Sequence, residues 1–185
     1  NIDAETCDAQ NGIFNAASTC DDTSCPTVGA CCTGTDTCTV TFADDCDGFF
    51  FSQQTCDEID CFDKVTVDPD AEGDDPANGI FSTIQGAIDA SYDGMTISLM
   101  AGTYTGDGDS VITLPEHGVT ITGTPGSTII DGEGTRRGLI GDGCGENGTV
   151  IQGLTFANGS ATGTDVKGGG VYLSGCSPTI TNCIF

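Results

Sequence analysis

The chain has 185 residues and a net charge of −24, because 28 acidic side chains face only 4 basic ones. So few cations cannot neutralise a track of phosphates, and the excess of acid disfavours adhesion to anionic lipid. The sequence contains no apolar run of about 18 residues, so no membrane-spanning helix is expected. The length allows one domain, or one domain with a small satellite.

Glycine and aspartate dominate the remaining composition. The 28 glycines, together with aspartates that far outnumber glutamates, disfavour a helical protein and favour short strands joined by turns. A hydrophobic fraction of 37% disfavours full disorder. We therefore expect an all-β chain.

Twelve cysteines indicate an oxidising compartment, and nine of them lie in the first third of the chain. Structural zinc is disfavoured because the chain has no C-x-x-C pair and His117 is its only histidine. The sequence begins at Asn1 without an apolar signal segment, which favours a processed, extracellular or cell-surface protein. We expect disulfides at these positions: Cys7, Cys20, Cys25, Cys31, Cys32, Cys38, Cys46, Cys56, Cys61, Cys144 and Cys176.

Asn147 and Asn158 begin N-glycosylation sequons, which fits export and predicts attached glycans. The alternative for each is a polar turn that carries no sugar. The sequence leaves that alternative open.

Residues 1–62 form a cysteine-rich unit with an internal repeat. The segment 18–25 matches the segment 54–61, although the first copy has only Cys7, Cys20 and Cys25 where the second has six cysteines. The pattern from Gly29 onward resembles small cysteine-rich repeats of large secreted bacterial surface proteins. That resemblance implies a structural module held by disulfides rather than by a large core.

Residues 63–78 are predicted to be an acidic linker in which 65–67 can form a short strand. The carboxylates of 68–76, and those of the second loop 106–110, are candidate Ca²⁺ ligands. We favour solvated turns in both places because neither spacing matches a defined calcium loop. No cofactor is therefore expected, with Ca²⁺ left open.

An amphipathic helix is predicted over 79–91, because Phe81, Ile84, Ala87 and Ile88 form one apolar stripe. Asn78 or Ser82 is the expected N-cap. Gly94 is expected to end the element.

Short β-branched segments bounded by turn residues follow, and they predict strands. They cover 96–100, 111–114, 119–122, 128–131, 139–140, 150–156, 170–173 and 179–185. The segment 119–123 aligns with 149–153, and 150–156 aligns with 179–185, which are shifts of 30 and 29 residues. Such a period predicts a parallel β-solenoid, in which Ile121, Ile151 and Ile180 occupy the equivalent position of successive coils. An antiparallel sandwich would also have short strands, but it would not require the same residue types at a fixed spacing of 29–30 residues.

The segments 81–90, 94–97 and 101–104 resemble the opening of right-handed parallel β-helix proteins of the pectin-lyase-like superfamily. Segments 168–173 and 177–183 resemble a coil of its secreted members. The resemblance covers 79–185 and implies about four right-handed coils with an N-terminal capping helix. It also implies a class in which most characterised members act on acidic polysaccharides.

The catalytic pattern of that superfamily is not reproduced. Asp131, His117 and Arg136 are the candidates worth testing, but the paired aspartates and the lysine that the hydrolases use are missing. An acidic protein would also repel a polyuronate. We therefore expect no enzymatic activity and turn roles for these residues.

The remaining cysteines suggest connections. A bridge between Cys144 and Cys176 would join successive coils. Cys183 aligns with the inward position of Leu154, so it is a buried thiol or pairs elsewhere, for example with the odd cysteine of the N-terminal unit.

These features lead to the hypothesis of a secreted structural protein that assembles head-to-tail into an extracellular fibre, its partner being a second copy. Ile180, Cys183, Ile184 and Phe185 would form the interface, since an uncovered solenoid end exposes backbone groups and apolar stacks. Two alternatives remain: a fragment of a larger polysaccharide-binding or polysaccharide-degrading β-helix protein, and a calcium-dependent adhesin.

Overall fold

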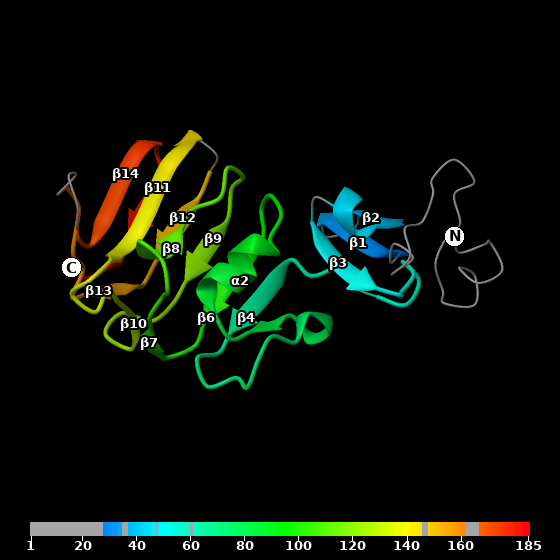
Figure 1. Cartoon of the computed structure of the whole chain (residues 1–185), viewed down its shortest axis with the longest axis horizontal. Coiled ribbons are helices and arrows are strands. Elements are labelled where there is room, and N and C mark those ends of the chain that lie inside the picture. Colours follow the sequence, from blue (N-terminus) through cyan, green and yellow to red (C-terminus); the bar gives the residue numbers. More distant parts are fainter. Residues whose placement is uncertain (1–27, 35–36, 47, 60, 146–147, 162–166) are drawn as a thin grey trace, which may run out of the picture. The chain divides into compact units, whose positions relative to one another are not determined.

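The computed structural model divides into two compact units, Asn1–Phe62 and Asp63–Phe185 (Figure 1). The structure describes residues 28–34, 37–46, 48–59, 61–145, 148–161 and 167–185. Cys7, Cys20, Cys25 and Asn147 lie outside the described residues.

A three-stranded antiparallel sheet forms the described part of the first unit. β1 (Val28–Gly34) is its central strand, between β2 (Thr37–Phe42) and β3 (Phe49–Ser52), and a 3-10 turn, η1 (Ala43–Asp45), follows β2. Gly29 is required here, because a Cβ at this position would lie only 2.1 Å from the Phe51 carbonyl oxygen. Within the described part of this unit, the buried apolar residues are Ala30, Cys31, Cys32 and Phe51.

Disulfides compensate for this small core. They join Cys31 to Cys46, Cys32 to Cys61 and Cys38 to Cys56, so the six cysteines from 31 to 61 are all paired with one another. Closing loops of 15, 29 and 18 residues lowers the entropy of the unfolded chain, which stabilises units too small to bury a large core.

The second unit is a parallel β-solenoid of about 4 turns. One sheet contains β4 (Lys64–Val67), β6 (Thr96–Leu99), β9 (Thr120–Thr122), β12 (Val150–Gln152) and β15 (Thr179–Thr181), with β5 (Ile80–Phe81) beside β4. A second sheet contains β7 (Gly102–Tyr104), β10 (Thr128–Asp131) and β13 (Thr155–Ala157). The third contains β8 (Ser110–Thr113), β11 (Arg137–Gly145) and β14 (Val171–Cys176).

The strand registers confirm the predicted repeat. Ile121 pairs with Ile151, and Ile151 pairs with Ile180, at the spacings the sequence predicts. The same row continues through Ile97 to Val65. Because parallel strands place equivalent residues directly beside one another, these apolar side chains stack into one continuous core.

Two further rows complete the interior. Tyr104, Ile130 and Phe156 align across the second sheet. Ile112, Leu139 and Val171 align across the third. The members of the middle turns are fully buried, with 0% exposure at Ile130 and Leu139.

The single described α-helix, α2 (Ile84–Asp89), is shorter than the predicted 79–91. Residues 80 and 81 form β5, and Thr83, rather than Asn78 or Ser82, caps the helix by accepting a hydrogen bond from the Gly86 N–H. Ser82 instead donates to Asp74 at 2.7 Å. The side chains of Ile84, Ala87 and Ile88 are buried, as the apolar stripe predicts. This helix is not long and apolar enough to cross a membrane.

The short strand predicted at 65–67 is present within β4, which pairs in register with β6. Val65 and Val67 face the core of the second unit with 1% and 0% exposure. The rest of the predicted acidic linker, up to residue 78, lies in the second unit.

Candidate functional site

Two of the three sheets end on the same side of the solenoid. β15 is the last strand of the six-stranded sheet, and β14 is the last strand of the β8–β11–β14 sheet. Beyond β13, the Ile184 N–H donates to the Leu154 carbonyl at 2.9 Å, and the Phe156 N–H donates to the Ile184 carbonyl at 2.8 Å. We refer to β14, β15, Ile184 and Phe185 as the open edge.

The open edge exposes large apolar side chains. The exposed fractions are 72% for Phe185, 48% for Ile184 and 36% for Leu173, whereas Ile151 in the preceding turn is 0% exposed. The ring of Phe185 stacks on Phe156 with a centroid separation of 5.2 Å and an interplanar angle of 9°. Apolar side chains are therefore much more exposed here than in the preceding turn.

A groove of about 370 Å³ lies beside this ring pair. Phe156, Phe185 and Val171 form its apolar walls, and Asn158, Gly159 and Gly170 complete it. Its residues all come from the last two turns, so the groove is part of the open edge.

The opposite side of the solenoid is built differently. α2 packs against β4, β5, β6 and β8, of which β5 and β8 are the edge strands of their sheets on this side. The Gln85 side-chain oxygen accepts a hydrogen bond from the Thr113 N–H on β8 at 3.0 Å. Pro69 lies over β7, because a Cβ on Gly102 would meet the Pro69 ring at 2.5 Å. The backbone groups of this side are thus partly covered by other elements.

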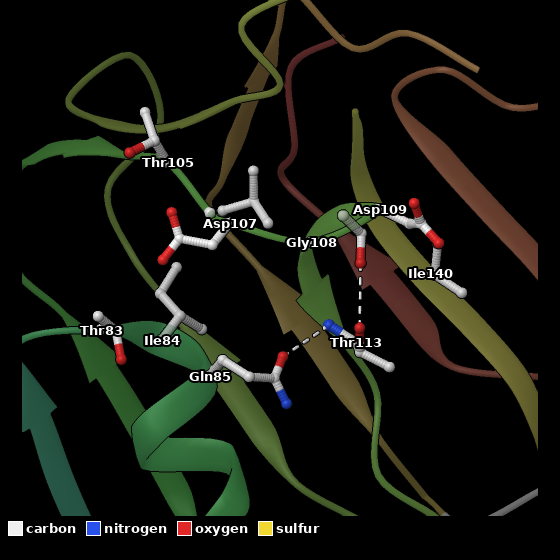
Figure 2. A pocket seen from close by; sticks show the side chains of 12 residues that line it. Thr83, Ile84, Gln85, Thr105, Asp107, Gly108, Asp109, Thr113 and Ile140 are labelled. Atoms are coloured by element: carbon white, nitrogen blue, oxygen red, sulfur yellow. Dashed lines mark hydrogen bonds between the residues drawn. The ribbon is translucent and has the colours of Figure 1, made fainter. Parts of the chain in front are cut away.

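A cleft of about 680 Å³ lies between α2 and the loop that joins β7 to β8 (Figure 2). Ile84, Val111 and Ile140 give it an apolar lining. Asp107 and Asp109 stand at its rim, both exposed. Figure 2 shows the Gln85–Thr113 hydrogen bond within this lining, so part of the cleft's polar surface is already engaged in holding the helix.

Cations gather near the open edge. The Arg137 guanidinium lies 5.0 Å from the centre of the Tyr172 ring on β14, a cation–π contact, and its Nε donates to the Lys167 carbonyl at 3.1 Å. Lys167 itself is exposed. The sequence analysis missed this group, although the clustering of three of the four cations between 136 and 167 was a usable signal.

The three candidate catalytic residues have separate structural partners. Both carboxylate oxygens of Asp131 accept from the Asn158 amide, at 3.0 and 3.1 Å. Arg136 forms a 3.1 Å ion pair with Glu133. The Asp131–Asn158 contact joins the turns of two neighbouring coils, whereas the Arg136–Glu133 pair lies within one turn.

His117 has a partner that also argues for a structural role. Its Nε2 lies 2.8 Å from the Ser91 hydroxyl, and that hydroxyl donates to the Ile88 carbonyl at 2.7 Å. These contacts link His117 through Ser91 to Ile88 of α2, and the tautomer of the imidazole decides which of the two atoms donates between Ser91 and His117.

The cysteines of the solenoid divide into a pair and a free thiol. Cys144 and Cys176 form a disulfide between the successive strands β11 and β14, as the spacing suggests. Cys183 is free and half-buried, with its sulfur 3.4 Å from the Thr181 carbonyl oxygen. It lies within the open edge region, one residue before Ile184.

Carboxylates in the acidic segment 68–76 accept hydrogen bonds from nearby backbone N–H groups. Asp68 accepts from the Asp70 N–H at 3.0 Å, and Asp74 accepts from the Ser82 N–H at 2.7 Å. Among the described residues, the one group of three potential metal ligands within reach of one another is Cys32, Cys38 and Cys61, and these sulfurs belong to disulfides.

Asn158, the described sequon residue, is exposed and adopts a left-handed backbone conformation with φ of 50°. Its amide nitrogen carries the two hydrogen bonds to Asp131. A glycan on this nitrogen would leave one N–H for that contact, so attachment remains a prediction.

No family model, no curated protein and no solved structure matches the chain. The parallel β-solenoid and the disulfides are therefore what can be stated of its class.

Proposed function

We propose that the chain is a secreted structural protein whose copies associate head-to-tail through the open edge, giving an extracellular fibre. The observation that carries the proposal is the contrast between the two sides of the solenoid. Elements of the chain cover the α2 side, whereas β14 and β15 present unpaired strand edges flanked by Ile184 and Phe185. Such edges readily accept a further strand or layer.

In this proposal α2 acts as a cap of the solenoid. Its buried stripe covers the ends of the apolar rows, and Gln85 supplies the acceptor that β8 lacks. The proposed hand of the solenoid is right-handed, because parallel strands connected within one sheet nearly always cross over in that sense.

A filament, rather than a closed ring, is the form of assembly that we propose. A contact between unlike surfaces of identical copies propagates unless its rotation closes. The disulfides fit export to an oxidising compartment, in which such a fibre would be assembled.

Negative-stain microscopy and sedimentation velocity of the full chain test the proposal. We expect concentration-dependent linear species, and we expect Ile184→Asp combined with Phe185→Asp to abolish them. Met100→Asp is the matched control, since Met100 is 49% exposed and Ile184 is 48% exposed, but Met100 lies away from the open edge. A wild-type chain that stays monomeric at every concentration overturns the proposal.

Intact mass of material from the natural source separates this proposal from the larger β-helix protein. A longer natural chain, with a further turn hydrogen-bonded to β14 and β15, would mean that the open edge is an internal layer. Cleavage of a polyuronate by that chain would then support an enzymatic function.

A further inference from the structure

The cleft between α2 and the loop that joins β7 to β8 has the size and the lining of a small-molecule site. Its volume of about 680 Å³ lies within the range of pockets that hold small ligands. Ile84 and Val111 are 3% and 4% exposed, and Ile140 is half-buried, so this part of the lining is apolar. The apolar portion of a ligand would therefore be shielded from water here.

Four polar side chains of the cleft, those of Thr83, Gln85, Ser110 and Thr113, are already hydrogen-bonded within the protein. The Thr83 hydroxyl accepts from a backbone N–H of α2 at 3.1 Å, and the Gln85 oxygen accepts from the Thr113 N–H at 3.0 Å. The Thr113 hydroxyl lies 3.0 Å from the Ser110 hydroxyl. These groups hold the helix and β8, so they have little capacity left for a neutral polar ligand.

The carboxylates of Asp107 and Asp109 differ from these groups. Both are exposed at the rim of the cleft, on the loop across from Gln85 of α2 (Figure 2). Within the part of the chain that the structure describes, neither carboxylate takes part in a hydrogen bond or an ion pair. Residues 63–118, which supply all of the lining except Ile140, carry 11 acidic side chains and one cationic side chain, Lys64. Such an excess of one charge around a cleft attracts ligands of the opposite charge.

We infer that the cleft binds a small organic cation, an ammonium or guanidinium group carried on an apolar stem. The stem lies against Ile84, Val111 and Ile140, and the charged group stays at the rim with Asp107 and Asp109. A carboxylate or phosphate ligand would be repelled by the same rim. A cation without a stem would leave the apolar lining unused. This inference goes beyond the proposed fibre and does not depend on it.

A series of ligands tests the inference on the full wild-type chain. Ligand-observed NMR titrations at low ionic strength compare n-hexylamine with n-butylamine, 1-hexanol and hexanoate. We expect n-hexylamine to bind about 3- to 10-fold more tightly than n-butylamine, because two more methylene groups are buried. We expect 1-hexanol to bind at least about threefold more weakly than n-hexylamine, and hexanoate to bind most weakly. No binding of n-hexylamine, or equal binding of 1-hexanol, overturns the inference.

Variants of the rim then locate the bound cation. Asp107→Asn combined with Asp109→Asn should weaken binding of n-hexylamine about 3- to 10-fold, and added salt should reduce the difference from wild type. The matched control combines Glu72→Gln with Asp142→Asn, two exposed residues outside the lining, and it should stay within about twofold of wild type. Equal binding by the two double variants overturns the assignment to this cleft. Binding of CaCl₂ in place of n-hexylamine overturns the inference in favour of a calcium loop at 106–110.

Discussion

The side-chain oxygen of Gln85 accepts a hydrogen bond from the Thr113 backbone N–H at 3.0 Å. A glutamine on a helix thus supplies β8 with an acceptor that a neighbouring strand would otherwise provide. The same side chain donates from Nε2 to Asp89 at 2.8 Å. Gln85 thereby makes one hydrogen bond within α2 and one to the edge strand β8. The relationship explains how a parallel sheet can stop without leaving that N–H unpaired.

Gln85→Ala is expected to destabilise the solenoid by about 0.5–1.5 kcal/mol, because the Thr113 N–H loses its acceptor. Asp89→Ala removes only the contact within the helix and should cost less. Chemical denaturation followed by circular dichroism measures both free energies of unfolding. Equal losses for the two variants would show that the hydrogen bond to β8 contributes nothing of its own.

The Tyr104 hydroxyl predicts a loss of stability at high pH. It lies 3.0 Å from the Val67 carbonyl and 2.9 Å from the Met100 carbonyl, and burial, with a smaller contribution from Asp68, raises its pKa to about 12. Because the unfolded tyrosine titrates near 10, the unfolded state releases its proton first, and stability falls as pH rises from about 10 towards 12.

Denaturation midpoints measured at a series of pH values test this prediction, with Tyr104→Phe as the comparison. The variant should be less stable near neutral pH by about 1 kcal/mol, since the Val67 and Met100 carbonyls lose the one hydroxyl that they share. Its stability should fall less steeply above pH 10, and a parallel fall in both proteins would contradict the assignment to Tyr104.

The row of Ile121, Ile151 and Ile180 predicts that the same isoleucine-to-alanine substitution lowers the free energy of unfolding by different amounts at different positions. Ile151 is 0% exposed between Ile121 and Ile180, so Ile151→Ala should cost about 2–5 kcal/mol through lost burial and a cavity. Ile180 belongs to the outermost strand and is only half-buried, so Ile180→Ala should cost clearly less in the dissociated chain. Thermal and chemical unfolding of the two variants decide the point. Similar costs would mean that the last turn is packed as tightly as the interior.

This row also shows how far sequence reasoning reached. The shifts of 30 and 29 residues predicted the register of Ile121, Ile151 and Ile180, because a solenoid repeats one position with each turn. They missed that Ile97 and Val65 belong to the same row, since the spacings of those turns differ. The alignment of sequence segments requires coils of equal length. Membership of the core row requires only that each coil place an apolar side chain at the inward position.

Other features could not be derived from local patterns. Thr83 rather than Ser82 caps α2 because Asp74, eight residues before Ser82, engages that serine. The Arg137–Tyr172 contact joins residues of neighbouring coils, so no short motif announces it. The interface residues Ile180, Cys183, Ile184 and Phe185 were predicted from an uncovered solenoid end, but the 48% and 72% exposure of Ile184 and Phe185 follows only from the three-dimensional arrangement.

Removing the disulfide of the solenoid gives a further prediction. Cys144 and Cys176 are 32 residues apart, so replacing both by alanine should cost about 2–4 kcal/mol by relieving a constraint on the unfolded chain. Cys183→Ser is the matched control, since that thiol is unpaired in the described structure. Unfolding under non-reducing conditions measures the difference. A reductant should lower the stability of the Cys144→Ala, Cys176→Ala variant less than that of wild type.

The spacing between equivalent residues changes from turn to turn, from 24 between Ile97 and Ile121 to 30 between Ile121 and Ile151. The stacked interior stays in register throughout, so the length of a connecting loop is not tied to the geometry of the rungs. Evolution can therefore lengthen and diversify the outer loops without redesigning the core, and a protein engineer can do the same. The 106–109 loop, whose glycines and aspartates lie at the surface, is a natural place for such grafted sequence.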